Sequence, residues 1–152
     1  MSRNWKSATC LLCVLPILSC SGARPPGLGV SGGGLSPCPS SPNCVSSDAP
    51  DEGHRVEAFV LAVAPDAGWR AVREEVAALP RTTVVTEQPN YLHAQCASAV
   101  FGFVDDLEVH LPEGSAELAV RSASRVGTSD LGVNRRRVER LRETLRARGV
   151  VR

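Results

Sequence analysis

The sequence has few aromatic side chains and almost no net charge. Phe, Trp and Tyr make up 4% of its 152 residues, and 17 basic against 16 acidic side chains give a formal net charge of +1. Proteins that bind single-stranded nucleic acid use aromatic side chains to stack on bases, and association with polyanions in general requires an excess of positive charge. The composition therefore argues against a nucleic-acid partner.

Sequence motifs of several common enzyme classes are also missing. No serine lies in a GxSxG nucleophile motif, and no glycine-rich phosphate loop with lysine is present. His54, His93 and His110 are the only histidines, and their spacing does not indicate a metal site. We therefore expect no metal and no cofactor, and the sequence favours a protein that is not an enzyme.

No apolar run is long enough to cross a bilayer, which takes roughly 20 residues. The run from Ala8 to Leu18 spans 11 residues and follows the basic side chains Arg3 and Lys6, a pattern typical of a signal peptide. It ends in Ile17-Leu18-Ser19-Cys20, which resembles the lipobox of bacterial lipoproteins. We expect a signal peptide over residues 1–19 and a lipid on Cys20; ordinary secretion after cleavage near Ala23 is the alternative.

The residues after Cys20 are rich in glycine and proline, so residues 20–36 are predicted to be a flexible tether and residues 37–152 a single domain. Cys38 and Cys44 then enclose a short segment with two prolines. Because an exported protein is in an oxidising compartment, these two cysteines are expected to form a disulfide. A metal-binding knuckle is the alternative, but it would need two further ligands.

From residue 56 onward, the hydrophobic pattern predicts seven elements in the order strand, helix, four strands, helix. The strands are expected at 56–64, 82–87, 91–97, 101–111 and 117–123, and Asp66 and Asn134 are the expected helix caps. Short turns between consecutive strands indicate antiparallel pairing. The predicted fold is an α+β two-layer sandwich, in which two helices cover a mostly antiparallel sheet of about five strands.

Several stretches resemble one family. They are Cys38-Pro-Ser-Ser-Pro-Asn-Cys-Val-Ser-Ser47, Tyr91-Leu-His-Ala94, Phe101-Gly-Phe-Val-Asp-Asp106, Arg121-Ser-Ala-Ser-Arg-Val-Gly127 with Ser129-Asp-Leu-Gly-Val-Asn134, and Arg137-Val-Glu139. They are similar to the bacterial and plastid family known as domain of unknown function 1499, over about residues 36–145. The resemblance implies the same domain in an exported setting, and it carries no catalytic residue with it.

The acidic pair Asp105-Asp106 lies in a predicted strand, where alternation places Asp105 on the apolar face. A buried carboxylate is costly without a partner, and Arg121 or Arg125 is the expected partner. Three interpretations remain open: a buried structural ion pair, a β-bulge at the two aspartates, or an active site in which both act as acid and base with Arg125 as an anion clamp.

The stretch from Arg121 to Asn134 combines hydroxyl groups, charges and glycines before a helix. Such a segment can bind an anion through backbone N–H groups and an arginine, or its polar side chains can simply cap the turn and helix. The candidate ligand-binding residues are Asp105, Asp106, Arg121, Ser122, Ser124, Arg125, Asp130 and Asn134.

Together these observations predict an exported, lipid-anchored envelope protein with a binding or structural role. Its expected partners are the membrane, through the anchor, and a small anionic ligand or another envelope protein. The alternative is an enzyme that uses Asp105 and Asp106. The arginine-rich last helix can in addition touch anionic headgroups.

Overall fold

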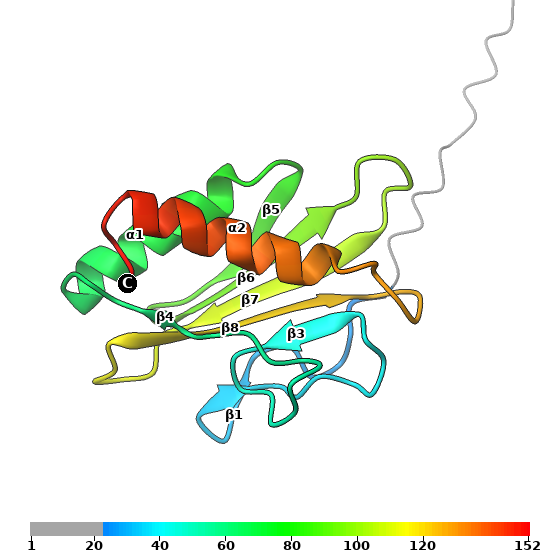
Figure 1. Ribbon diagram of the computed structural model, residues 1–152, viewed down its shortest axis with the longest axis horizontal. Helices are drawn as coiled ribbons and strands as arrows, with labels where there is room; N and C mark the ends of the chain where they lie inside the picture. The colour runs from blue at the N-terminus through cyan, green and yellow to red at the C-terminus, as the bar shows by residue number, and fades with distance from the viewer. Residues whose placement is uncertain (1–22) are drawn as a thin grey trace, which may run out of the picture.

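Residues 23–152 are described by a computed structural model in which two helices lie on one face of a sheet (Figure 1). In chain order, the elements are β1 (Val30–Ser31), β2 (Gly34–Leu35), β3 (Cys44–Ser46), β4 (Phe59–Val60), α1 (Pro65–Ala78), β5 (Thr82–Glu87), β6 (Tyr91–Ala97), β7 (Val104–His110), β8 (Glu117–Ser124) and α2 (Val133–Ala147). The signal peptide and Cys20 lie outside the described residues. No helix within residues 23–152 has the length and apolar character needed to cross a membrane.

The main sheet has the strand order β3-β8-β7-β6-β5, and β4 pairs with the beginning of β8. All of its named strand pairs are antiparallel. The two predicted hairpins, β5 with β6 and β7 with β8, are present. The predicted α+β fold with a helix-covered antiparallel sheet is thus confirmed, with six strands in the sheet and β1 and β2 in a small separate one.

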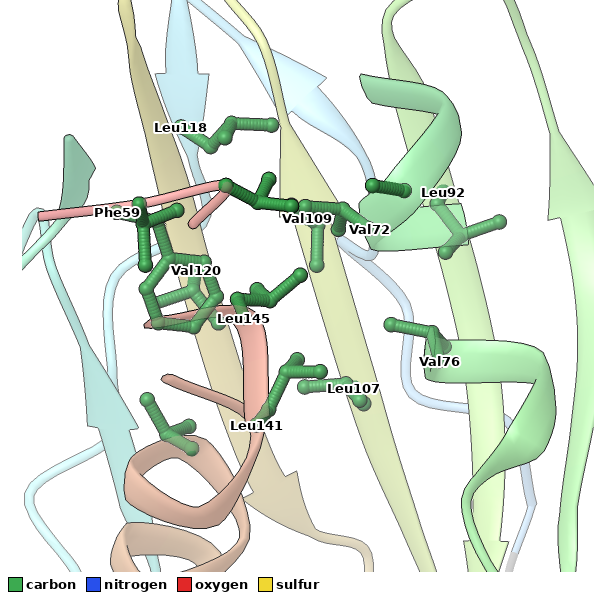
Figure 2. Packing of buried hydrophobic residues seen from close by; sticks show 14 of the residues in the cluster. Phe59, Val72, Val76, Leu92, Leu107, Val109, Leu118, Val120, Leu141 and Leu145 are labelled. Carbon is green, nitrogen blue, oxygen red and sulfur yellow. The ribbon is translucent and has the colours of Figure 1, made fainter. Parts of the chain in front are cut away.

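The core lies between the helices and the sheet (Figure 2). Val72 and Val76 of α1 and Leu141 and Leu145 of α2 are fully buried there, as the apolar spacing of both helices predicts. They pack with alternate residues of the strands and with Phe59, the one phenylalanine of the chain in the core. Burial of side chains of this size contributes roughly 1.5–3 kcal/mol each, so this layer is the main source of stability.

Several element ends differ from the expected ones. β4 contains only Phe59 and Val60, and the next residue, Leu61, forms an isolated antiparallel bridge with Val151. β7 starts at Val104, after Gly102 with a φ of 65°. Asp66 does not cap α1 through its side chain; the helix starts at Pro65, whose ring already fixes a helical φ. α2 starts at Val133 after Gly132, so Asn134 lies inside the helix and is not its cap.

Residues 23–36 differ from the expected flexible tether. Val30 pairs with Leu35 and Ser31 with Gly34, and the two residues of the turn, Gly32 and Gly33, have φ values of 63° and 87°. A two-residue hairpin turn of this kind requires positive φ at both positions, which glycine adopts without strain. The glycines of this segment therefore form a defined hairpin, which lies on the side of the sheet opposite the helices (Figure 1).

The predicted disulfide is present between Cys38 and Cys44, whose Cα atoms are 5.6 Å apart. Cys44 is the first residue of β3 and is buried. The bond therefore fixes the loop that leads into the edge strand of the sheet. Cys96 of β6 is free and buried, as expected for a packing residue.

Candidate functional site

The candidate residues of β7 lie on opposite faces of the sheet. Asp105 is opposite Ser124 and faces the helices, whereas Asp106 is opposite Ala123 and faces away from them. Glu108 and His110 share the face of Asp106. The two aspartates therefore do not form one site.

Asp105 pairs with an arginine of α2. Its carboxylate accepts a hydrogen bond from Nη2 of Arg137 at 2.5 Å. The prediction that Arg121 or Arg125 pairs with Asp105 is wrong. Arg121 lies opposite Glu108 and Arg125 binds Asp106, and these two acids are on the other face of the sheet. The prediction that Asp105 lies on the apolar face is confirmed, since it shares that face with Leu107 and Val109 in the core.

Asp106 holds together two basic side chains on the face away from the helices. Arg125 donates from Nε to one carboxylate oxygen at 2.9 Å and from Nη2 to the other at 2.8 Å, and Nε2 of His93 lies 2.7 Å from the same carboxylate. Burial alone would raise the pKa of Asp106, but the hydrogen bonds from His93 and Arg125 outweigh it and hold that pKa below its usual range. The carboxylate is thus kept ionised.

Glu108 is the centre of a second group on the same face. It accepts hydrogen bonds from Tyr91 Oη at 2.7 Å, from Arg121 Nη1 at 2.9 Å and from the backbone N–H of Gly29 at 2.7 Å. Burial, together with the charge of Glu108, raises the pKa of Tyr91 well above its usual range. Tyr91 is therefore a hydrogen-bond donor here and does not ionise.

The segment of residues 23–36 covers the Glu108 group. Gly29 reaches Glu108, and Leu35 packs against Tyr91 and Ala119 in a small buried cluster. Glu108 and His93 are completely buried, and Asp106 is 1% exposed. A ligand could reach Glu108 only if this segment moved away.

Three buried nitrogen atoms on this face have no hydrogen-bond partner among residues 23–152. They are Nδ1 of His93, Nδ1 of His110 and Nε of Arg121. Burial lowers the pKa of His110, against a smaller opposing effect of Asp48, which favours the neutral imidazole. The face is therefore a tightly closed polar layer with a few unmet hydrogen bonds.

Asn134 of α2 connects most of the other candidate residues on the helix side. Its side-chain oxygen accepts a hydrogen bond from Ser122 at 2.6 Å, and its side-chain nitrogen donates to Ser124 at 2.9 Å. Asp130 accepts from the backbone N–H of Asn134 at 2.7 Å and of Gly132 at 2.9 Å. Burial opposes these bonds, but they lower the pKa of Asp130.

The structure thus separates the predicted site into two sets. Ser122, Ser124, Asp130 and Asn134 come together on the helix side, where Arg137 donates to both Ser122 and Asn134. Asp106, Arg121 and Arg125 lie on the other face.

Two adjacent pockets open where α2 begins. The first has a volume of about 330 Å³, and four arginines line it without any acidic side chain: Arg81, Arg136, Arg137 and Arg140. The second, also of about 330 Å³, is lined by Asp105, Ser124 and Asp130, and it shares Ser98 and Val133 with the first. Arg125 is not among the residues that line either pocket.

Sequence reasoning missed the arginine pocket. Arg136, Arg137 and Arg140 are spaced so that they share one side of a helix, but that spacing alone predicts a basic helix face that can touch anionic headgroups and does not indicate a pocket. Arg81 is remote in sequence and joins them because the turn after α1 lies beside the start of α2. Arg142 of the same helix is not part of the exposed basic face: it is buried over the Phe59 ring and donates to the backbone oxygens of Glu57 and Ala58.

Across the described residues, no group of three or more His, Cys, Asp or Glu side chains is arranged to hold a metal ion.

The fold and these networks define a class: a two-layer α+β domain with a sealed charged layer on one sheet face and a basic pocket beside its second helix. Residues 34–145 match the family described as protein of unknown function (DUF1499), and because the match spans most of the chain, the protein belongs to that family. No curated protein and no solved structure matches the chain.

Proposed function

We propose that this protein is an exported envelope lipoprotein whose domain binds a small anionic ligand in the arginine pocket beside α2. The observation that carries the proposal is the convergence of Arg81, Arg136, Arg137 and Arg140 on one pocket that no acidic side chain lines. Arginine side chains bind carboxylates and phosphates through paired, charge-assisted hydrogen bonds. A pocket of about 330 Å³ lies at the small end of the range for small-molecule sites.

The arginines of the pocket differ in how far they are already engaged. Arg137 is paired with Asp105, and Arg136 donates to the backbone oxygen of Leu131. The guanidinium of Arg140 is exposed and makes no hydrogen bond or ion pair with residues 23–152. Arg140 is therefore the side chain that an incoming anion would engage without breaking an existing bond.

The export part of the proposal is supported by the sequence and by the disulfide. The basic start, the apolar run and the sequence ending at Cys20 fit a lipoprotein leader. The Cys38–Cys44 bond fits an oxidising compartment. A lipid on Cys20 would hold the domain against the outer face of a membrane.

The effect of a single substitution on the affinity for anions tests the pocket. In the presence of inorganic phosphate, citrate or a phosphomonoester at about 100 times its dissociation constant, the folded state should gain about 2.7 kcal/mol, seen as a rise in Tm of several degrees. Arg140→Ala should weaken the affinity by about tenfold to a hundredfold, measured by calorimetry, because it removes a charge-assisted hydrogen bond worth roughly 1.5–3 kcal/mol.

Arg70→Ala is the matched control, since Arg70 is an exposed arginine of α1 that makes no hydrogen bond or ion pair with the described residues. It should leave affinity unchanged. A panel of anions that never shifts Tm, or equal affinities in the two variants, would remove the basis of the ligand proposal.

The lipid anchor has its own test. Cys20→Ser should abolish incorporation of a labelled fatty acid and release the protein from the membrane fraction, because the thioether-forming sulfur is gone. Cys13→Ser, which changes a cysteine inside the expected signal peptide, should keep both the label and the membrane fraction. A Cys20→Ser protein that still carries lipid would show that the anchor is misassigned.

The alternative function, an enzyme with Asp105 and Asp106 as acid and base, has less support. Its carboxylates lie on opposite sides of the sheet, and the pocket that contains Asp105 lacks Arg125. Fully paired buried charges favour a structural role for Asp106 and Arg125. A binding domain is therefore the function that the geometry supports best.

A further inference from the structure

Two loops at one end of the sheet expose large apolar side chains to solvent. The 98–103 loop joins β6 to β7 and the 125–132 loop joins β8 to α2. Val100, Phe101 and Leu131 are 81%, 71% and 85% exposed. We call the group formed by Val100, Phe101, Phe103, Val126, Leu131 and Val133 the apolar tip.

Four members of the apolar tip lie close together. The rings of Phe101 and Phe103 stack with their centres 5.5 Å apart. Phe103, Val126 and Val133 line one pocket, which brings the two loops and the start of α2 together. Six of the nine exposed large hydrophobic side chains of the described residues belong to the tip, so the exposure is concentrated there. Concentrated exposure of this kind marks an interaction site.

The placement of the phenylalanines and the backbone conformation of Leu131 also indicate an interaction site at the apolar tip. The chain has three phenylalanines, and two of them lie in the tip while one is in the core. Leu131 has a left-handed backbone with a φ of 52°, which is unfavourable for a leucine. Its side chain gains no burial in return. Both features are costly for folding and point to contact with something outside the chain.

The charge around the apolar tip is positive. Exposed Arg136 and Arg140 line the pocket that Val133 also lines, and exposed Arg81 lies in the same pocket. The acidic side chains nearby are already engaged, Asp105 by Arg137 and Asp130 by backbone N–H groups. A second copy of the chain docked on the tip would bring arginines against arginines. An anionic lipid surface would not.

We propose that the apolar tip inserts into the interface of an anionic bilayer while Arg81, Arg136 and Arg140 contact lipid phosphates. Apolar side chains at the interface with basic residues beside them are the pattern of peripheral membrane binding, and each basic residue near such a surface strengthens binding about fivefold. Figure 1 shows the first described residues toward the end of the molecule that carries both loops. This placement is compatible with a lipid upstream of them.

This inference goes beyond the ligand pocket, because the tip can meet a bilayer whether or not a soluble anion binds. Its test uses the full chain with Trp5→Phe and Phe101→Trp, so that the introduced indole and the buried Trp69 are the fluorophores. Brominated phosphatidylcholine vesicles with and without phosphatidylglycerol supply the quencher. Since the apolar leader can itself bind vesicles, the readout is quenching of the introduced indole and not total binding.

The introduced indole should be quenched in vesicles that contain phosphatidylglycerol, beyond the signal of the Trp5→Phe protein. Adding Arg136→Gln and Arg140→Gln should lower the equilibrium constant for insertion of the tip into the bilayer about 25-fold, because two phosphate contacts are lost. Quenching of the indole should fall accordingly. Arg70→Gln with Arg146→Gln, at a distance from the tip, should leave quenching unchanged. Val63→Trp, placed in the β4–α1 loop at the opposite end (Figure 1), should remain unquenched.

Three results would overturn the inference. The first is an absence of quenching for Phe101→Trp, and the second is equal quenching for Phe101→Trp and Val63→Trp. The third is a concentration-dependent dimer in sedimentation that Phe101→Ser abolishes, since a second copy of the chain would then cover the tip. None of these results would alter anion binding in solution, so they leave the ligand pocket to its own test.

Discussion

Replacement of Asp106 by alanine is expected to lower the free energy of unfolding by about 3–5 kcal/mol, measured by urea denaturation. The carboxylate is 1% exposed and binds both Arg125 and His93. Without it, a buried guanidinium loses its counter-charge and a buried imidazole loses its hydrogen bond. The loss should far exceed that of an ordinary surface ion pair.

The matched control is Glu87→Ala, which removes an acidic partner of Arg73 from a pair whose side chains are 39% and 46% exposed. This change should cost less than about 1 kcal/mol, since water replaces the lost contact. If Asp106→Ala were as mild as Glu87→Ala, the Asp106 group would not be a buried ion pair.

The same substitution has a pH signature. The folded pKa of Asp106 lies below its unfolded value of about 3.9, so the ion pair stabilises the fold above about pH 4 and loses this contribution as the pH falls through the folded pKa. The difference in unfolding free energy between wild type and Asp106→Ala should therefore be largest at neutral pH and shrink in acid. A difference that grew in acid would contradict the assigned pKa direction.

The sequence was sufficient to predict the fold because its local patterns and its packing agree. The β-branched residues of 82–87 and the alternation through 91–97 predict the β5–β6 hairpin, and the three-and-four spacing of Trp69, Val72 and Val76 predicts the buried side of α1. Each of these features depends on neighbours in sequence. The order of elements and the layer arrangement follow from them.

The pairing of buried charges was not predictable in the same way. Alternation fixes the face on which Asp105 lies, but its partner depends on which helix crosses that face. α2 brings Arg137 to Asp105, although Arg121 and Arg125 are closer in sequence. Alternation with buried Leu118 and Val120 also gives the face of Arg121, but which acidic residue lies opposite it depends on the register of β8 against β7, which no local pattern reveals.

Composition misled the interpretation of residues 23–36. A glycine-rich stretch has a large ordering entropy and is typical of a linker. Here Gly32 and Gly33 occupy positions with positive φ, where glycine is the residue that fits, and Gly29 binds a charge on the sheet. Glycine content alone does not distinguish a linker from a hairpin with positive φ; the distinction comes from what the segment contacts.

The two polar regions of the molecule have different physical characters. On the face away from the helices, Asp106 and Glu108 are buried and paired with His93, Arg125 and Arg121, which favours stability and specificity over ligand exchange. At the start of α2, arginines outnumber acids, and the guanidinium of Arg140 makes no hydrogen bond or ion pair with residues 23–152. A candidate for binding therefore belongs to the second region, and substitutions in the first should act mainly on folding.

Glu108→Ala is expected to show this folding role most directly, with a loss of about 3–5 kcal/mol in the free energy of unfolding. Glu108 is completely buried, and the substitution leaves Arg121, Tyr91 and the Gly29 N–H without their acceptor. The lost bond to Gly29 should also loosen residues 27–35. Hydrogen exchange should then be faster in this segment than in the wild type, by more than global unfolding explains.

Tyr91→Phe is the matched control, because it removes one hydrogen bond to Glu108 and leaves both the charge and the Gly29 contact. Its expected cost is about 1 kcal/mol, with unchanged exchange at residues 27–35. If both variants lost the same free energy of unfolding, the buried charge of Glu108 would contribute no more to stability than one hydrogen bond. Unchanged exchange at 27–35 in Glu108→Ala would mean that the hairpin is held to the sheet by Leu35 and its apolar neighbours and not by the carboxylate.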